Sequence, residues 1–275
     1  MARSDVDRTL RKVFGEAVEE YDAGRPAYPD RLFTDVLDYA RRGADGRVEA
    51  LEALEVGAGT GKATLAFAAH GVRVTAVEPD PRMAAALARH CAGDPGIIVE
   101  EGEFETWDPA GRRFGLLFSA QAWHWIDPET GWSRARSALR PGGTLAIFRN
   151  DWYVTDEPLR HELTAVHDRF LPERPSHSLF DEPPSEPDHG EYAWVATRLR
   201  TDPGFTDPAH RVYTTSHTPT TTDFTALLTS LSFYRVQPPD TRRRLLTEVA
   251  RIVGTHGGHV DLTVTTGLFL ARTTG

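Results

Sequence analysis

Leu54-Glu55-Val56-Gly57-Ala58-Gly59-Thr60-Gly61-Lys62-Ala63-Thr64 is the stretch that decides the fold of this chain. An apolar run over residues 50–56 passes through three glycines, at every second position, into a segment with helical apolar spacing. The pattern predicts a buried strand, a tight turn and the N-terminus of a helix. Such a turn in an open α/β sheet binds nucleotide-like ligands, because glycine allows positive φ and places no Cβ in the ligand's way.

A second predicted strand ends in an acidic residue. Residues 72–77, Val-Arg-Val-Thr-Ala-Val, predict a buried strand, and Glu78 follows it directly, 21 residues after Gly57. An acid at this position can accept both ribose hydroxyls of an adenosine. The alternative is a solvated loop acid or a charge at the start of the next helix. The spacing between Glu78 and the glycine turn favours the interpretation that Glu78 binds the ribose.

The glycine spacing indicates which ligand is bound. A dinucleotide fingerprint reads Gly-x-Gly-x-x-Gly, and Lys62 stands where its third glycine should be, which disfavours an NAD-dependent oxidoreductase. An acid followed by Gly-x-Gly-x-Gly resembles the first motif of class I S-adenosylmethionine (SAM)-dependent methyltransferases. The resemblance implies SAM as cofactor and S-adenosylhomocysteine (SAH) as product. The residues that it implies around the methionine end of SAM are Glu55, Gly57, Ala58, Gly59 and Gly61.

The segment before the first strand carries a second resemblance. Residues 21–29, Tyr-Asp-Ala-Gly-Arg-Pro-Ala-Tyr-Pro, resemble the Tyr-x-x-Gly-Arg-Pro-x-Tyr-Pro segment of one group of small-molecule SAM methyltransferases. The resemblance implies that the segment folds over the cofactor, with Tyr21 and Arg25 facing its methionine end. Its prolines and glycine predict a loop and exclude a helix. A structural loop whose aromatic side chains only pack is the alternative.

Later motifs keep the order of the same family, so that the resemblance covers residues 21–148. The further cofactor contacts that it implies are Pro79, Met83, Glu103, Phe104, Ser119 and Ala120. Pro79 and Met83 follow the second strand, where Met83 would lie against the adenine. Glu103 and Phe104 follow the third strand, although the family commonly has Asp in place of Glu103. Ser119 and Ala120 lie at the end of the predicted fourth strand. Residues 122–127, Ala-Trp-His-Trp-Ile-Asp, resemble the fourth methyltransferase motif.

The composition is that of a globular, water-soluble protein. The chain of 275 residues is 40% hydrophobic and 26% charged, without a membrane-span or signal-peptide pattern. Cys91 is the one cysteine, which excludes an intramolecular disulfide and a cysteine-built zinc site. The formal net charge of −9 argues against a general nucleic-acid binder. We expect a cytoplasmic protein without a nucleic-acid partner, a membrane partner or a metal.

The predicted elements give an α/β fold. We expect a Rossmann-like, seven-stranded, mostly parallel sheet with an antiparallel C-terminal strand, and helical insertions that cap the cleft. The sixth and seventh strands are expected at about residues 210–218 and 260–271. The expected domains are an amphipathic N-terminal helix over 1–20, a SAM-binding core over 21–150, a substrate-binding cap with the sixth strand over 151–255, and a final core strand over 256–275. The first helix could be a lid or join a homo-oligomer.

Aromatic residues gather in the region expected to form an acceptor pocket. The candidate acceptor contacts are Tyr21, Trp123, His124, Trp125, Trp152, Tyr192 and Trp194. His124 follows the fourth strand and can titrate near neutrality, so it is the candidate general base or substrate-orienting group. A structural hydrogen bond to the next turn is the alternative. The aromatic side chains favour methyl transfer to carbon, oxygen or nitrogen of an apolar or aromatic small molecule, such as a specialised metabolite.

Two other functions stay open. Carboxylate methylation of a small organic acid, as in trans-aconitate methyltransferase-like enzymes, would need a cluster of arginines, for which Arg149, Arg198 and Arg200 are the candidates. A non-catalytic SAM-binding protein would keep the glycine turn but lack an acceptor cavity.

Overall fold

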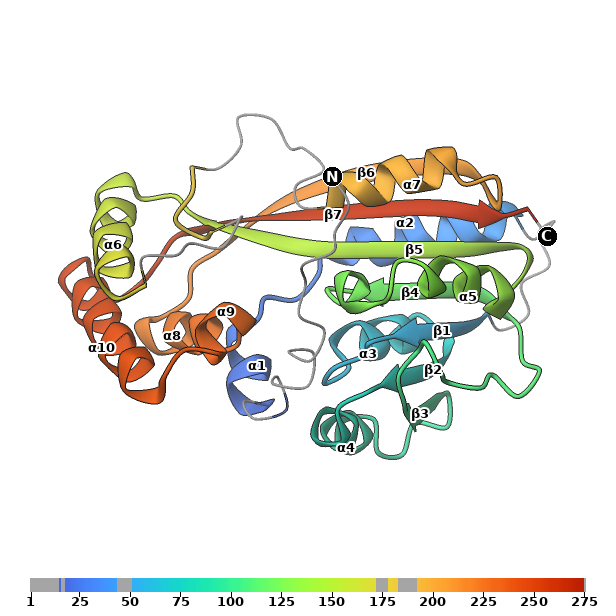
Figure 1. Ribbon diagram of the computed structural model, residues 1–275, viewed down its shortest axis with the longest axis horizontal. Coiled ribbons are helices and arrows are strands. Elements are labelled where there is room, and N and C mark those ends of the chain that lie inside the picture. The colour runs from blue at the N-terminus through green and yellow to red at the C-terminus, as the bar shows by residue number, and fades with distance from the viewer. Residues whose placement is uncertain (1–14, 16–17, 44–50, 172–177, 183–191, 275) are drawn as a thin grey trace.

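The computed structural model describes residues 15, 18–43, 51–171, 178–182 and 192–274. Within these ranges a seven-stranded sheet runs through the molecule, and helices cover its faces and gather at one of its ends (Figure 1). The predicted N-terminal helix over residues 5–20 lies outside the described residues except for its last part.

The sheet has the strand order β3-β2-β1-β4-β5-β7-β6. Its strands are β1 (Glu52–Val56), β2 (Arg73–Glu78), β3 (Ile97–Glu101), β4 (Phe114–Ala120), β5 (Leu139–Val154), β6 (Phe205–His217) and β7 (Leu262–Thr273). Strands β1 to β5 pair in parallel, whereas β7 is antiparallel to both of its neighbours, β5 and β6. The predicted Rossmann-like, mostly parallel sheet with an antiparallel C-terminal strand is confirmed.

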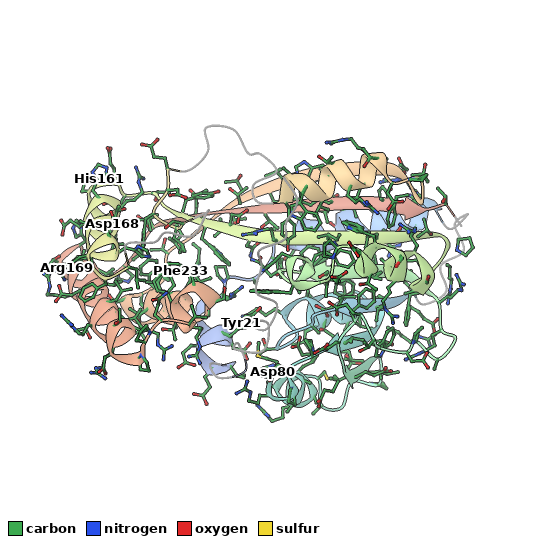
Figure 2. All side chains as sticks on the ribbon, viewed as in Figure 1. Tyr21, Asp80, His161, Asp168, Arg169 and Phe233 are labelled. Carbon is green, nitrogen blue, oxygen red and sulfur yellow. The ribbon has the colours of Figure 1, made fainter. Side chains whose placement is uncertain are left out.

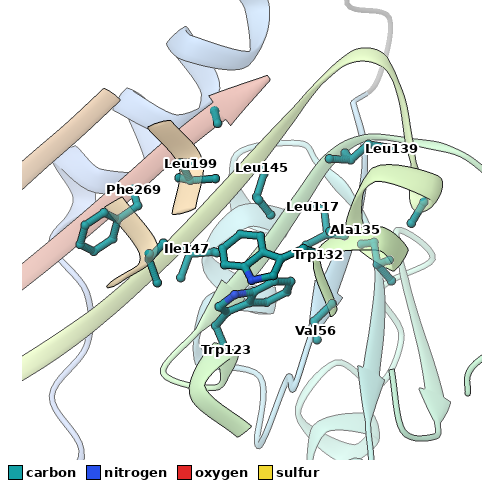
Figure 3. Close-up of a cluster of buried hydrophobic side chains, with 14 of the residues drawn as sticks. Val56, Leu117, Trp123, Trp132, Ala135, Leu139, Leu145, Ile147, Leu199 and Phe269 are labelled. Atoms are coloured by element: carbon teal, nitrogen blue, oxygen red, sulfur yellow. The ribbon is translucent and has the colours of Figure 1, made fainter. Parts of the chain in front are cut away.

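Helices lie on both faces of the sheet. The described helices are α1 (Val18–Gly24), α2 (Asp30–Gly43), α3 (Lys62–Ala69), α4 (Pro81–His90), α5 (Thr130–Ala138), α6 (Glu157–Phe170), α7 (Ala193–Thr201), α8 (Thr221–Thr229), α9 (Ser232–Arg235) and α10 (Pro239–Thr255). One face packs on α2, α3 and α4, and the other on α5 and α7. Figure 3 shows the core between the sheet and the face covered by α5 and α7, with the indoles of Trp123 and Trp132 at its centre. Within the described ranges, no helix combines the length and the apolar character that a bilayer span needs.

Helices α6, α8, α9 and α10 form a separate group, the helical lobe, at one end of the sheet (Figure 1). They enclose a third buried cluster together with the far ends of β5 and β7, from which Trp152 and Val264 contribute. The predicted cap of residues 151–255 is therefore divided between two places, because α7 and β6 lie with the sheet and only the other helices form the lobe.

Two segments differ from the sequence prediction. The sequence places the end of the core at residue 150, but β5 continues to Val154 because eleven consecutive residues, Thr144–Val154, pair with β7. The sequence also predicts a loop over residues 21–29, whereas Tyr21–Gly24 completes α1. Proline first occurs at Pro26, beyond the end of that helix, so it does not interrupt the helix.

Helix α1 is fixed to the helical lobe by a close backbone contact. A Cβ on Gly24 would lie 2.3 Å from the backbone nitrogen of Leu227 in α8, so only glycine permits this approach. Arg25 extends the contact, since its guanidinium donates to the Oγ and carbonyl oxygen of Ser230 at 3.2 and 2.9 Å.

The other side of α1 is fixed to the glycine turn and to α4. The carboxylate of Asp22 accepts a hydrogen bond from Thr60 Oγ1, and Lys62 Nζ donates to the Asp22 carbonyl oxygen at 2.8 Å. His90 Nε2 of α4 lies 3.5 Å from the same carboxylate. Helix α1 therefore connects the helical lobe to the turn between β1 and α3.

We predict that Gly24→Ala lowers the free energy of unfolding by about 1–3 kcal/mol, because the new Cβ forces α1 and α8 apart. The matched control is Gly254→Ala in α10, where a Cβ meets no atom within 4 Å. This control should raise stability by roughly 0.5–1 kcal/mol through the reduced entropy of the unfolded chain. Urea unfolding measures both. Equal stabilisation by the two substitutions would contradict the close crossing of α1 and α8.

Candidate functional site

A cavity of about 320 Å³ lies at the carboxyl ends of the parallel strands, between the sheet and the helical lobe. Its size is at the lower end of the range of pockets that hold small molecules, roughly 300–1,000 Å³. The walls come from α1, the glycine turn, the start of α4, the segment after β3, the 3₁₀ turn Trp123–Trp125, the end of β5 and α9. Figure 2 labels Tyr21 on α1 and Phe233 on α9, two residues of the cavity lining.

The three glycines of the turn have different neighbours. Each has a positive φ, 72° at Gly57, 59° at Gly59 and 94° at Gly61. A Cβ on Gly57 would lie 2.4 Å from Ala122 Cβ, and one on Gly61 would lie 2.2 Å from Leu87 Cδ1. A Cβ on Gly59 would meet no atom closer than 3.7 Å and would enter the cavity. Gly57 and Gly61 thus allow close packing, while Gly59 leaves room for a ligand.

Glu78 lies at the end of β2 with its carboxylate at the cavity and only 5% of the residue exposed. The backbone N–H groups of Gly59 and Asp80 donate to its two oxygens at 2.7 and 2.9 Å. These bonds fix the carboxylate against the glycine turn. A carboxylate fixed at this position is an acceptor of the kind to which ribose hydroxyls donate.

Glu55 does not face this cavity. It is 1% exposed and accepts a hydrogen bond from Thr64 Oγ1 of α3. Burial raises the pKa of Glu55 to about 8; the Thr64 bond opposes the increase and the nearby Glu78 adds to it. The side chain borders a second cavity of only about 20 Å³, beneath α1, with space for about one water molecule. The predicted direct contact of Glu55 with the methionine end therefore has no counterpart in the main cavity.

Nine of the predicted cofactor residues line the main cavity: Tyr21, Arg25, Gly57, Gly59, Glu78, Pro79, Met83, Phe104 and Ala120. Ala58 borders the small cavity instead, and Ser119 is buried, with its Oγ donating to the Val56 carbonyl oxygen at 2.9 Å. Gly61, packed on Leu87, is also outside the lining.

The acid after β3 that reaches the cavity is Glu105, two residues beyond the predicted Glu103. The carbonyl oxygen of Glu103 instead closes a turn by accepting from the N–H groups of Thr106 and Trp107. Glu105 Oε1 accepts from the Asp127 backbone N–H at 3.1 Å, which fixes the carboxylate beside the 3₁₀ turn. The sequence prediction was Glu103 alone, and it is the turn after β3 that brings the carboxylate of Glu105 to the cavity.

His124 lies in the 3₁₀ turn after β4 and lines the cavity. Its Nδ1 is 2.8 Å from Tyr192 Oη, and its backbone N–H donates to the same oxygen at 3.3 Å. Tyr192 is fully buried and is outside the lining, so it contacts His124 and not the cavity.

The predicted aromatic side chains divide between cavity and core. Trp125 and Trp152 line the cavity. Trp123 packs on Trp132 with ring centroids 5.1 Å apart, and Trp194 packs against the same core cluster. Tyr153, Phe233 and Tyr234 complete the aromatic lining, the last two from α9 of the helical lobe.

An ion pair at the end of β5 is a feature that the sequence did not indicate. Arg149 and Asp151 both line the cavity, with a guanidinium nitrogen 2.5 Å from Asp151 Oδ1. The Arg149 guanidinium also lies 5.0 Å from the centroid of the Tyr192 ring. Of the three arginines considered for a carboxylate site, Arg198 pairs with Asp202 and Arg200 is exposed on α7, so only Arg149 reaches the cavity.

Several further lining residues were also not predicted, and they are Gln121, Ala122, Ile126, Ser178, Leu179, Leu231 and Ser232. Gln121 has a φ of 60°, a left-handed conformation that costs a non-glycine residue free energy and that is concentrated at functional sites. Among the described residues, no group of three or more His, Cys, Asp or Glu side chains is placed to hold a metal ion.

We predict that the buried Glu55 makes stability fall with pH. The folded protein keeps the proton up to pH about 8, whereas the unfolded chain loses it near 4.5. Between these values the free energy of unfolding decreases by about 1.4 kcal/mol per pH unit because of this group. Glu55→Gln should remove this part of the slope in urea unfolding at pH 6, 7 and 8. Glu101→Gln, at an exposed residue at the end of β3, serves as the control. A slope that Glu55→Gln leaves unchanged would show that Glu55 is ionised in the folded protein.

Comparison with known proteins agrees with the fold. A family profile described as a methyltransferase domain matches residues 53–143. Uncharacterized methyltransferases of Mycobacterium tuberculosis and Mycobacterium bovis are 35% identical to the chain over 152 residues. That alignment covers 55% of this chain and 56% of each relative, little more than half of their length. A solved structure from Anaeromyxobacter dehalogenans, assigned as a type II methyltransferase, is 25% identical, with a TM-score of 0.56 over 90% of this chain and 97% of that one. Residues 53–143 thus match a methyltransferase domain, and the chain spans little more than half the length of its curated relatives.

Proposed function

We propose that this protein transfers the methyl group of SAM to an apolar or aromatic small molecule, of the kind found among specialised metabolites. One observation carries the proposal. A single cavity extends from the glycine turn, where the cofactor is expected, to an aromatic wall on the helical lobe. Donor and acceptor could therefore bind side by side in a space enclosed by both parts of the molecule.

The residues at the sheet side of the cavity fit SAM. Gly59 leaves the backbone open to a ligand, and the Glu78 carboxylate is fixed where ribose hydroxyls would donate to it. Met83 and Phe104 offer apolar surfaces for an adenine, and Glu105 offers an acceptor for its amino group. Bound SAM would supply a methyl group on a positively charged sulfur. The role of the chain is to hold and orient that group.

The residues on the lobe side fit an acceptor with an apolar body. Trp152, Tyr153, Phe233 and Tyr234 contribute aromatic side chains to the cavity lining, the last two from α9 of the lobe. Methyl transfer requires an in-line approach of the acceptor atom, and alignment alone can lower the barrier by roughly 7–11 kcal/mol. His124 at the same cavity is our candidate for a general base or an orienting group, and the attacked atom could be carbon, oxygen or nitrogen.

The alternatives receive less support. A carboxylate acceptor would find Arg25 and Arg149 at the cavity, but Arg25 donates to Ser230 and Arg149 is paired with Asp151. A non-catalytic SAM-binding protein has no need of an acceptor wall. The lobe side of the cavity therefore favours an enzyme, with carboxylate methylation as the second candidate.

We predict micromolar binding of SAM and SAH, but not of NAD, in isothermal titration calorimetry. Gly59→Arg should abolish binding because its side chain would enter the cavity. The matched control is Gly71→Arg, which replaces another glycine with positive φ, 80°, at a site with no atom within 4 Å of a new Cβ. The control should bind SAM like the wild type. Equal loss of binding in both variants, or no binding by the wild type, would contradict the cofactor assignment.

Methyl transfer itself is tested by incubating the protein with isotope-labelled SAM and a panel of phenols, amines and aromatic and organic acids, followed by mass spectrometry. We expect SAH and a labelled product with at least one apolar or aromatic acceptor. Binding of SAH without transfer to any class would favour the non-catalytic alternative.

A further inference from the structure

We propose that the hydroxyl group of Tyr234 determines acceptor specificity by forming a hydrogen bond with a neutral polar atom on an otherwise apolar acceptor. The inference rests on the proposed function, because it concerns the acceptor that binds in the same cavity. It narrows the acceptor from any apolar or aromatic molecule to one that carries an uncharged hydroxyl or carbonyl group.

Tyr234 belongs to the core of the helical lobe and reaches the cavity from there. The residue lies in α9, is 3% exposed and packs in the buried cluster of the lobe. Its ring centroid lies 5.7 Å from that of Phe233, and its backbone N–H donates to the Leu231 carbonyl oxygen at 3.1 Å. All three residues line the cavity. Contacts within this short segment therefore fix the Tyr234 ring at the cavity.

The hydroxyl group of Tyr234 makes no hydrogen bond to any residue that the structure describes. Tyr213 gives the contrast, because its hydroxyl donates to Asp35 Oδ2 at 2.7 Å. The Tyr234 oxygen is not sealed from solvent, unlike the indole nitrogen of Trp152, which is closed off without a partner among the described residues. Since Tyr234 lines the cavity and is otherwise buried, the space that its hydroxyl reaches is the cavity.

The chemistry of a buried phenol decides what this group can bind. Burial raises the pKa of Tyr234, so the phenol stays protonated at neutral pH. It is therefore not suited to remove a proton from the acceptor or to pair with a cation through a charge of its own. A neutral phenol donates one hydrogen bond and also accepts. It can donate to the oxygen of a carbonyl or hydroxyl group, or accept from a hydroxyl hydrogen.

The buried position makes this hydrogen bond selective. Water that enters the cavity can bond to the phenol when no acceptor is bound. A purely apolar ligand would displace that water and leave the hydroxyl without a partner. Such a ligand should bind roughly 5- to 150-fold more weakly than one of similar shape that replaces the bond.

Nuclear magnetic resonance tests the bond with simple probes in place of the acceptor. The sample is uniformly ¹³C,¹⁵N-labelled protein saturated with SAH. The signal of Tyr234 Cζ, the carbon that carries the hydroxyl, is assigned through the backbone resonances of the same residue and needs no variant. Phenol, acetophenone and toluene are each titrated at millimolar concentration. We expect phenol or acetophenone to shift the Cζ signal more than toluene does, and the larger of the two shifts distinguishes a hydroxyl from a carbonyl group.

A shift by toluene as large as those of the polar probes, or no shift with any probe, would overturn the proposal. Absence of SAH binding in calorimetry would instead contradict the proposed function.

Urea unfolding separates a ligand-binding hydroxyl from a structural one. Tyr234→Phe keeps the ring in the lobe core and should leave the unfolding midpoint unchanged or raise it, because the lost hydroxyl has no partner within the described structure. The matched control Tyr213→Phe should lower the midpoint, since it removes the bond to Asp35. Tyr234→Phe should also abolish the preference for the polar probes over toluene, whereas the control should retain it. Equal destabilisation by the two substitutions would place the Tyr234 hydroxyl in a bond within the protein and overturn the proposal.

Discussion

The antiparallel pairing of β5 with β7 is the interaction on which the architecture of the site depends. Eleven residue pairs, from Thr144–Arg272 to Val154–Leu262, join the two strands. The pairing carries both strands past the edge that β1, β2 and β4 share and into the helical lobe, as Figure 1 shows. Because β5 and β7 enter the core of the lobe, the lobe stands opposite the carboxyl ends of the shorter strands. The cavity is the space between these two parts.

Buried polar contacts connect β5 to β7 and to the segment after α1. Asn150, in the extended part of β5, is 1% exposed and accepts from Thr266 Oγ1 of β7 at 2.6 Å. Its amide nitrogen lies 3.5 Å from the carbonyl oxygens of Pro26 and Ala27, just after α1. Strand β5, which enters the lobe, thus also holds the segment that follows α1. Helix α1 and β5 are therefore coupled, and the position of α1 over the glycine turn follows from both.

The sequence indicated the half of the site that local pattern determines. The glycine turn, Glu78 and the order of the strands could be predicted because backbone conformation and strand ends dictate them. The extension of β5 could not, since Arg149-Asn150-Asp151 reads as polar loop and its burial depends on partners on β7, more than 100 residues away. Asn150 shows this best, because a buried amide is stable only with the Thr266 bond that the fold supplies.

Side-chain contacts across the fold account for the other differences. Tyr192 was expected at the acceptor, but its hydroxyl contacts His124, 68 residues earlier. Trp123 and Trp194 were expected in the pocket, but helices α5 and α7 bring a core around Trp132 that takes up both rings. An aromatic residue in the correct segment can face either the core or the cavity. Only the packing of the helices decides which.

A crystal structure of the SAH complex would test the account most directly. We expect the ribose hydroxyls of SAH to donate to Glu78 and the backbone of Gly59 to contact the ligand. The sulfur should face the part of the cavity wall formed by His124 and Trp125. The remaining volume in front of the sulfur should be bounded by Trp152 and Phe233 of the lobe side. SAH bound outside the cavity, or with its sulfur turned away from the lobe, would contradict a single site shared by cofactor and acceptor.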